Sequence, residues 1–460
     1  MKPMVMKCHS RSAMLHDSAA VLQTAAFALT ALLPLALLPL ATSQSALAQS
    51  VDQLHFDLHL ADHRLPDARL TDISPTGGLS FKSASDSKSY SMNEIVRWGK
   101  VRGSVGADLV WLGDGSWLAG QIQWKSEQAF ELVSDWFERV ELRLDEVRGI
   151  VFQPPFSSRE FADLEQRMRG ATGAADVVWN GRSEQLSGLL TLKLRQPIDE
   201  AMPAIPTWDL QPSGATERVM LDRTNLQAIV FSPVLRLPIR ASQGAVQIDL
   251  RDGSRLNVLS LDRDAAGRVT VALGDGRKLE AVDLSPQFTS AITRIAGQPE
   301  RVTWLSGLEP ARYRFMQEES RLSWPLGRDR DLFGKALFID NDPVSHAVVL
   351  HAPAQVAYRW DGRKAKFLAE VSATAPASDL ATAVGSVQCR VLVARDGQLV
   401  ELFKSATLRP GTPAVAIEVD ISDAQLVVML ADPADQGSIG DHVLWRDARL
   451  VPLETNQDSR

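Results

Sequence analysis

The sequence predicts an all-β protein, with small β-barrel-like repeats in its N-terminal part and a jelly-roll-like β-sandwich at its C-terminal end. Three observations support this fold class. Short runs of alternating apolar and polar residues dominate the chain after residue 50, and Gly, Asp, Asn and Pro separate them. One pattern of such runs recurs four times before residue 300. A different arrangement of runs begins at Arg301.

The first 48 residues follow the order of a secretory signal peptide. Basic residues come first, an apolar run spans Ala25–Ala41, and Ala46-Leu47-Ala48 fits an A-x-A cleavage signal. A retained membrane anchor is the alternative, but two prolines interrupt the run, which is shorter than the roughly 20 residues of a spanning helix. We therefore expect a secreted or periplasmic protein without a membrane span in the mature chain.

The repeats are clearest over Ala107–Phe152, where the turn Asp114-Gly115 supplies the positive φ of a tight hairpin. Weaker copies occupy about Leu54–Trp98, Val177–Phe231 and Ala245–Ile295. About five short strands in each copy predict small barrels, tandem or paired, that close on themselves and are loosely similar to Sm-type barrels. Hairpins packed into one larger meander would leave the same pattern.

One segment has helical rather than alternating spacing. Phe161, Leu164 and Met168 follow a candidate serine cap, so we expect one short helix near 157–169. The predicted division is 1–48 signal peptide, 49–153 two repeat units, 154–170 helical linker, 171–300 two further units, 301–455 sandwich, and 456–460 disordered tail.

The C-terminal region carries four landmarks in a fixed order. They are Val302–Pro310 (VTWLSGLEP), His351–Gly362 (HAPAQVAYRWDG), Gly385–Gly397 (GSVQCRVLVARDG) and Gly440–Leu450 (GDHVLWRDARL). In order and spacing they resemble the NPCBM family of carbohydrate-binding modules, over about 150 of the 460 residues. The resemblance implies a sandwich of two antiparallel sheets, galactose-type ligands in some relatives, and frequent attachment to glycoside hydrolases.

The chain departs from the family pattern in two segments. Ser345–Val349 stands where relatives tend to carry glycine-rich sequence, and Ser372–Ser378 stands where they tend to have an acidic, glycine-containing turn. Both segments are candidate ligand-side loops. A sandwich that has lost sugar binding is therefore an open alternative.

The candidate ligand-binding residues are of the types that bind sugars, which need an aromatic face together with fixed polar groups. They are His351, Tyr358, Trp360, Asp441, His442 and Trp445. Core packing is the competing interpretation for Trp445, and a structural hydrogen-bonded pair is the competing one for Asp441 and His442.

Other candidate sites carry weaker signals. The loop Asp432–Gly437 offers oxygen ligands for Ca²⁺, although a solvated turn explains it as well. The stretch with Trp111, Trp117, Trp124 and Trp136 could form a binding platform, but strand spacing favours core. Cys389 alternates in phase with valines, which predicts a buried residue on a strand.

Composition narrows the function further. A net charge of −7 without a basic cluster argues against nucleic acid as a partner. The sequence has no H-E-x-x-H, G-x-S-x-G or Walker A motif, and no cofactor is expected. We expect an exported, non-catalytic glycan-binding protein of undefined oligomeric state. The alternatives are an envelope-associated interaction protein and a glycoside-hydrolase-type enzyme with unrecognised carboxylates.

Overall fold

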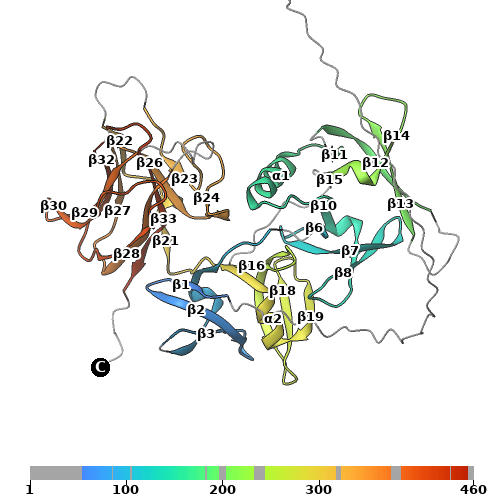
Figure 1. The fold of residues 1–460 in the computed structure, drawn as a ribbon, viewed down its shortest axis with the longest axis horizontal. Helices are drawn as coiled ribbons and strands as arrows, with labels where there is room; N and C mark the ends of the chain where they lie inside the picture. The colour runs from blue at the N-terminus through green and yellow to red at the C-terminus, as the bar shows by residue number, and fades with distance from the viewer. Residues whose placement is uncertain are drawn as a thin grey trace, which may run out of the picture. The chain divides into compact units, whose positions relative to one another are not determined.

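The computed structural model describes residues 54–84, 86–103, 106–181, 184–195, 204–232, 244–316, 323–374, 385–435 and 437–453. The predicted signal peptide and the C-terminal tail lie outside these residues. The described chain is built from antiparallel strands (Figure 1), so the predicted all-β class is confirmed.

The N-terminal part forms four units of five strands each. Unit A holds β1 (Phe56–Leu60), β2 (Arg64–Ile73), β3 (Leu79–Lys82), β4 (Ser87–Tyr90) and β5 (Ile95–Gly99). Unit B holds β6 (Asp108–Leu112), β7 (Trp117–Ser126), β8 (Ala129–Val133), β9 (Val140–Arg143) and β10 (Val147–Val151). Unit C holds β11 (Asp176–Asn180), β12 (Gln185–Arg195), β13 (Ile205–Pro212), β14 (Val219–Leu221) and β15 (Leu226–Val230). Unit D holds β16 (Val246–Leu250), β17 (Arg255–Arg263), β18 (Arg268–Leu273), β19 (Lys278–Leu284) and β20 (Ile292–Ala296).

All four units share one hydrogen-bonding order, in which the fifth strand pairs with the first and the first four strands follow as a meander. A short helical element precedes each fifth strand: η1 (Met92–Glu94), η2 (Leu144–Glu146), η3 (Arg223–Asn225) and α2 (Ser285–Ala291). In η1 the pair Ser91 and Glu94 forms a capping box that satisfies the free backbone N–H groups of the turn. The β-rich repeats of the predicted fold are therefore confirmed.

The expected closure of each unit into a barrel is wrong for the described strands. No pairing joins the fourth strand of a unit to its fifth. The fifth strands pair between units instead, β5 with β20 and β10 with β15. The last of these pairings needs glycine, because a Cβ on Gly149 would lie 2.4 Å from the Ile229 carbonyl oxygen.

Helix α1 (Ser158–Gly170) confirms the helix expected near 157–169, and α2 is a second helix that the sequence did not reveal. Ser157 caps α1 by accepting a hydrogen bond from the Glu160 backbone N–H. The buried face of α1 carries Phe161, Leu164 and Met168, which share a cluster with Trp111 and Trp117. These two tryptophans therefore pack in a core, as does Trp124 in the larger core of the four units.

The C-terminal region is a two-layered β-sandwich, as expected. One sheet has the order β23 (Gly327–Arg328), β26 (Ala347–His351), β33 (His442–Pro452), β28 (Ala365–Thr374) and β31 (Val415–Asp420), with β21 (Thr303–Trp304) also on β33. The other has the order β22 (Arg312–Phe315), β27 (Ala354–Arg359), β32 (Leu426–Pro433), β29 (Val387–Arg395) and β30 (Gln398–Lys404). A short turn η5 (Leu305–Gly307) follows β21, and a hairpin pairs β24 (Phe338–Ile339) with β25 (Asp342–Pro343).

The sandwich core arises from the in-phase apolar positions of these strands. On β29, Val387, Cys389, Val391 and Val393 are all fully buried. Cys389 is thus a free thiol in the core, and its burial raises its pKa well above the ordinary value. A thiol in this setting is protonated and packs like a small apolar side chain.

Candidate functional site

Two of the candidate residues, His351 and His442, lie against each other at one end of the sandwich. His351 ends β26 and His442 begins β33, and the two are direct cross-strand partners. Their ring centroids are 5.0 Å apart in an edge-to-face arrangement. Asp441 precedes His442, is buried, and accepts a hydrogen bond from the Ser386 backbone N–H at 2.8 Å. The structure thus brings three of the six candidates together.

The other three candidates lie elsewhere. Tyr358 and Trp445 are fully buried among the core residues of the sandwich. Trp360 follows β27, and its indole Nε1 donates to the Arg363 carbonyl at 2.9 Å. Since β27 starts just after His351, Trp360 is separated from the histidine pair by the length of that strand, roughly 20 Å.

Two aromatic residues that sequence reasoning missed complete the surface at the histidine pair. The Trp324 ring stacks on His351 with centroids 4.5 Å apart and planes 4° from parallel. Trp324 also meets His442 edge-on at 5.5 Å. Phe333 lies 5.8 Å from Trp324 and 6.4 Å from His442. We call Trp324, Phe333, His351 and His442 the aromatic surface.

Phe333 is the most accessible member of the aromatic surface, with 59% of its area exposed. It stands at the tip of a turn in which Asp331 accepts hydrogen bonds from the Phe333 and Lys335 backbone N–H groups, at 2.9 and 2.8 Å. Gly334 completes the turn at a φ of 79°, in the left-handed region that glycine adopts without strain. An exposed apolar side chain is therefore held in a fixed place. An aspartate two residues before an aromatic residue and three before a glycine was the sequence signal for it.

Both imidazoles of the aromatic surface are neutral near pH 7. Burial and the neighbouring His351 lower the pKa of His442 to about 4, against a smaller opposing effect of Asp331. Burial likewise lowers the pKa of His351. The Nδ1–H of His351 donates to the Ala352 carbonyl at 2.8 Å, which leaves Nε2 as an acceptor. The surface thus combines an uncharged aromatic face with an imidazole acceptor.

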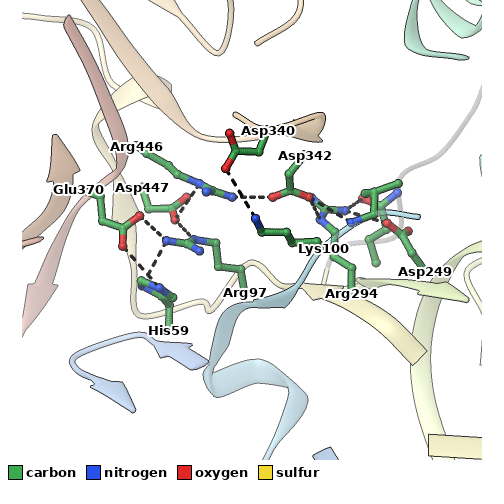
Figure 2. A network of polar contacts seen from close by, with 12 residues as sticks. His59, Arg97, Lys100, Asp249, Arg294, Asp340, Asp342, Glu370, Arg446 and Asp447 are labelled. Atoms are coloured by element: carbon green, nitrogen blue, oxygen red, sulfur yellow. Dashed lines mark hydrogen bonds and ion pairs between the residues drawn. The ribbon is translucent and has the colours of Figure 1, made fainter. Parts of the chain in front are cut away.

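A second polar site joins the sandwich to the repeat units. Figure 2 shows its charged side chains, which alternate in sign along one chain of contacts: Glu370, Arg97, Asp447, Arg446, Asp342, Arg294 and Asp249. We call this chain the junction network. Arg97, Arg294 and Asp249 belong to the repeats, on β5, β20 and β16. The other four belong to the sandwich, on β25, β28 and β33.

Asp447 is a central member of the junction network. It lies at a β-bulge of β33 with a φ of 53°, and its carboxylate accepts from Arg97 Nε at 2.5 Å. Burial alone would raise its pKa, but Arg97, Arg446 and Arg449 hold the pKa well below the ordinary value. Asp447 is therefore ionised, and it offsets the charge of the arginines around it.

Three further contacts close the rest of this junction. Arg449 donates to the Ala61 and Leu60 carbonyls, each at 2.9 Å. His59 lies 3.5 Å from Glu370, and its pKa is lowered to about 2 by burial and by Arg97. A small apolar cluster of Ala61, Val302, Leu368 and Val451 packs beside them.

In the loop for which calcium binding was predicted, Asp432–Gly437, two carboxylates are paired with arginines. Asp432 pairs with Arg390 at 2.5 Å, and Asp435 pairs with Arg409. Among the described residues no group of three or more His, Cys, Asp or Glu side chains is arranged to hold a metal ion. The described chain also contains no helix that is long and apolar enough to cross a membrane.

The family model of the NPCBM/NEW2 domain matches residues 301–451, about a third of the chain. The resemblance predicted from the sequence is therefore confirmed for this region. No curated protein matches the chain.

Solved structures similar to this chain include several carbohydrate-binding modules of family 51. The module of Clostridium perfringens GH95 in complex with methyl-galactose is 16% identical, with a TM-score of 0.27, over 33% of this chain and 99% of that one. The tandem modules of the family 98 glycoside hydrolase Sp3GH98 from Streptococcus pneumoniae are 12% identical, with a TM-score of 0.28, over 87% and 96%. The second module of C. perfringens ZmpB with its INT domains, in complex with GlcNAc, is 21% identical, with a TM-score of 0.28. That similarity covers 47% of this chain and 45% of the ZmpB fragment.

Proposed function

We propose that this protein is an exported, non-catalytic carbohydrate-binding protein whose sandwich recognises a neutral sugar at the aromatic surface. The observation that carries the proposal is Phe333, which is 59% exposed and fixed beside Trp324, His351 and His442 in an NPCBM/NEW2 domain. Phe333 is exposed next to other aromatic rings rather than singly, and such a group of rings can pack against the C–H face of a sugar.

The chemistry of the aromatic surface fits a pyranose ring. The C–H face of a sugar packs against an aromatic ring, and its hydroxyl groups need nearby polar partners. Phe333 supplies the face, and no described residue donates to Nε2 of His351, which can accept from a hydroxyl. Since both histidines are neutral near pH 7, the surface has no charge that would require an acidic sugar.

Export and the absence of catalysis are the other parts of the proposal. The N-terminal order of basic residues, apolar run and A-x-A triplet supports export. The lack of catalytic motifs supports a binding role. Signal-peptide cleavage is checked by mass spectrometry of the protein recovered outside the cytoplasm, where a mature chain starting near Gln49 is expected. Release of free sugar from a bound glycan would overturn the non-catalytic part.

Glycan-array binding of the full mature chain, followed by calorimetric titration with methyl-galactoside and GlcNAc, tests sugar recognition. Phe333→Ala should weaken binding by about tenfold or more, because it removes the exposed stacking partner. Phe156→Ala is the matched control, since Phe156 is 80% exposed on another part of the chain and should leave binding unchanged. If no glycan binds, or if Phe333→Ala binds as well as the wild type, the sandwich has a structural or partner-binding role instead.

A further inference from the structure

The junction network encloses one side of a cavity of about 170 Å³. Residues of β5 and β20, of β16 and β17, and of the sandwich contribute to its lining. The polar side chains on its walls are Arg97, Gln247, Asn257, Arg294, Gln298, Ser345, His346, Arg446 and Asp447. Gln298 and Ser345 are exposed, so the cavity reaches the surface beside them.

Two nitrogen atoms of the lining residues are buried without a hydrogen-bond partner in the described chain. They are Nε of Arg446 and Nε2 of His346. Arg446 Nε lies 3.8 Å from an Asp447 oxygen, which is too long for a hydrogen bond, although Arg446 Nη2 binds Asp342 at 2.8 Å. The His346 ring is fixed by stacking on Trp304 at 4.0 Å. A buried polar atom left without a partner is unfavourable, so two such atoms lining one cavity point to a ligand there.

The charge of the lining indicates the kind of ligand. Three arginines face one carboxylate, Asp447, among the residues that line the cavity. The remaining carboxylates of the junction network, Glu370, Asp342 and Asp249, do not line it, although each of them pairs with one of these three arginines. Oxygen acceptors with negative charge are the partners that guanidinium groups prefer.

We propose that this cavity binds a small oxyanion, with Nε of Arg446 and Nε2 of His346 donating to its oxygens. The anion is a carboxylate, sulfate or phosphate group. The volume equals that of about five or six water molecules, which admits such a group but not a whole oligosaccharide. A longer ligand would place its acidic group inside the cavity, and the rest of the ligand would extend to the surface beside Gln298 and Ser345. The site is separate from the aromatic surface and does not depend on the function proposed for it.

Titration of the full mature chain at low ionic strength tests the proposal. Sodium sulfate, phosphate and acetate probe free anions, galacturonate probes the acidic group of a sugar, and methyl-galactoside is the uncharged control. Binding of one anion per chain is expected, without binding of methyl-galactoside to this cavity. A stronger response to galacturonate than to acetate would assign the site to acidic glycans, and the reverse would assign it to free anions.

Two substitutions test whether bound anion occupies this cavity. His346→Phe keeps the ring that stacks on Trp304 and removes Nε2, and Arg446→Lys keeps a cation for Asp342 and removes Nε. Each should weaken anion binding by about tenfold or more, the value of one charge-assisted hydrogen bond. Lys125→Gln, which removes an exposed charge on β7, should have no effect. If Arg446→Lys fails to fold, His346→Phe and the mouth-blocking Ser345→Trp still decide the question.

The proposal is overturned if none of the anions binds, which would mean that solvent alone fills the cavity. It is equally overturned if an anion binds with unchanged affinity to His346→Phe, because the anion then occupies another surface. Phe333→Ala should leave anion binding intact, which separates a failure here from a failure of the sugar proposal.

Discussion

Asp252 lies in the turn between β16 and β17 of unit D and is 4% exposed. Its Oδ1 accepts from the Ser254 backbone N–H at 2.9 Å, while Oδ2 is without a hydrogen-bond partner in the described chain. Burial raises the pKa of Asp252 from 3.8 to about 6, and repulsion by Asp135 adds to the effect. An asparagine at this position would keep the Oδ1 acceptor and remove the buried charge.

The size of the effect follows from this pKa. A tenfold change in proton affinity is worth about 1.4 kcal/mol, so the ionised Asp252 costs about 3 kcal/mol of folding free energy. Because the folded-state pKa is raised, this cost is small near pH 4, grows as the pH rises from about 4 to about 6, and is complete above about pH 7. Asp252→Asn should therefore raise the free energy of unfolding by up to about 3 kcal/mol at pH 8 and by about 0.5 kcal/mol at pH 4.

Urea denaturation of the full chain at pH 8 and pH 4 measures this difference. The matched control is Asp114→Asn at the same turn of unit B. There Oδ2 accepts from Ser116 Oγ at 2.8 Å and from the Gly274 backbone N–H at 3.1 Å, so an amide nitrogen would face a donor. That variant should lose about 1–3 kcal/mol. Equal effects of Asp252→Asn at both pH values would refute the assignment of a buried, costly charge to this turn.

Three further predictions concern other parts of the chain. Asp447→Asn should lower the free energy of unfolding by about 3–5 kcal/mol, measured by urea denaturation at pH 7, because it leaves buried arginines without their carboxylate; an unchanged midpoint would contradict the junction network. Gly149→Ala should destabilise by about 1–3 kcal/mol in the same assay, because its Cβ would meet Ile229, whereas Gly113→Ala, with open space around it, should not. Sugar affinity at the aromatic surface should fall as the pH is lowered to about 4 and His442 becomes charged; calorimetric titration from pH 8 to pH 4 checks it, and an affinity that is unchanged at pH 4 would contradict a role for His442.

The strands and the repeats were predictable because their cause is local. Alternation places apolar side chains on one face of a strand, and Asp-Gly pairs set the turns between strands. The pairing of β5 with β20 was not, because residues about 200 positions apart leave no joint pattern in one sequence. That pairing is also why the predicted closure of each unit into a barrel was wrong. The number of strands does not say whether the edge strand of a unit pairs within its own unit or with a strand of a neighbouring unit.

The same contrast holds for the candidate site. Tyr358 alternates in phase with Val356, and Trp445 with Val443, so strict use of period two would have placed both in the core. Phe333 and Trp324 lie about 110 residues before their neighbour His442. They belong to a turn and a loop, where apolar residues follow no regular spacing, so the sequence pattern did not indicate their contact with His442. The bulge at Asp447 breaks the alternation of β33. The sequence pattern therefore did not indicate which side chains of this strand contact the repeats.

One strand connects the two functional proposals. β33 begins with His442 at the aromatic surface and carries Arg446 and Asp447 into the junction network, about 13–17 Å further along the strand. Along this length β33 is hydrogen-bonded to β26 and β28, so one strand holds both groups of side chains. Removing the repeats would expose Asp447 together with Arg446 and Arg449, which are charges that only their present partners neutralise. The sandwich is therefore expected to require the repeats for its full stability, which is why sugar and anion binding are both measured on the whole mature chain.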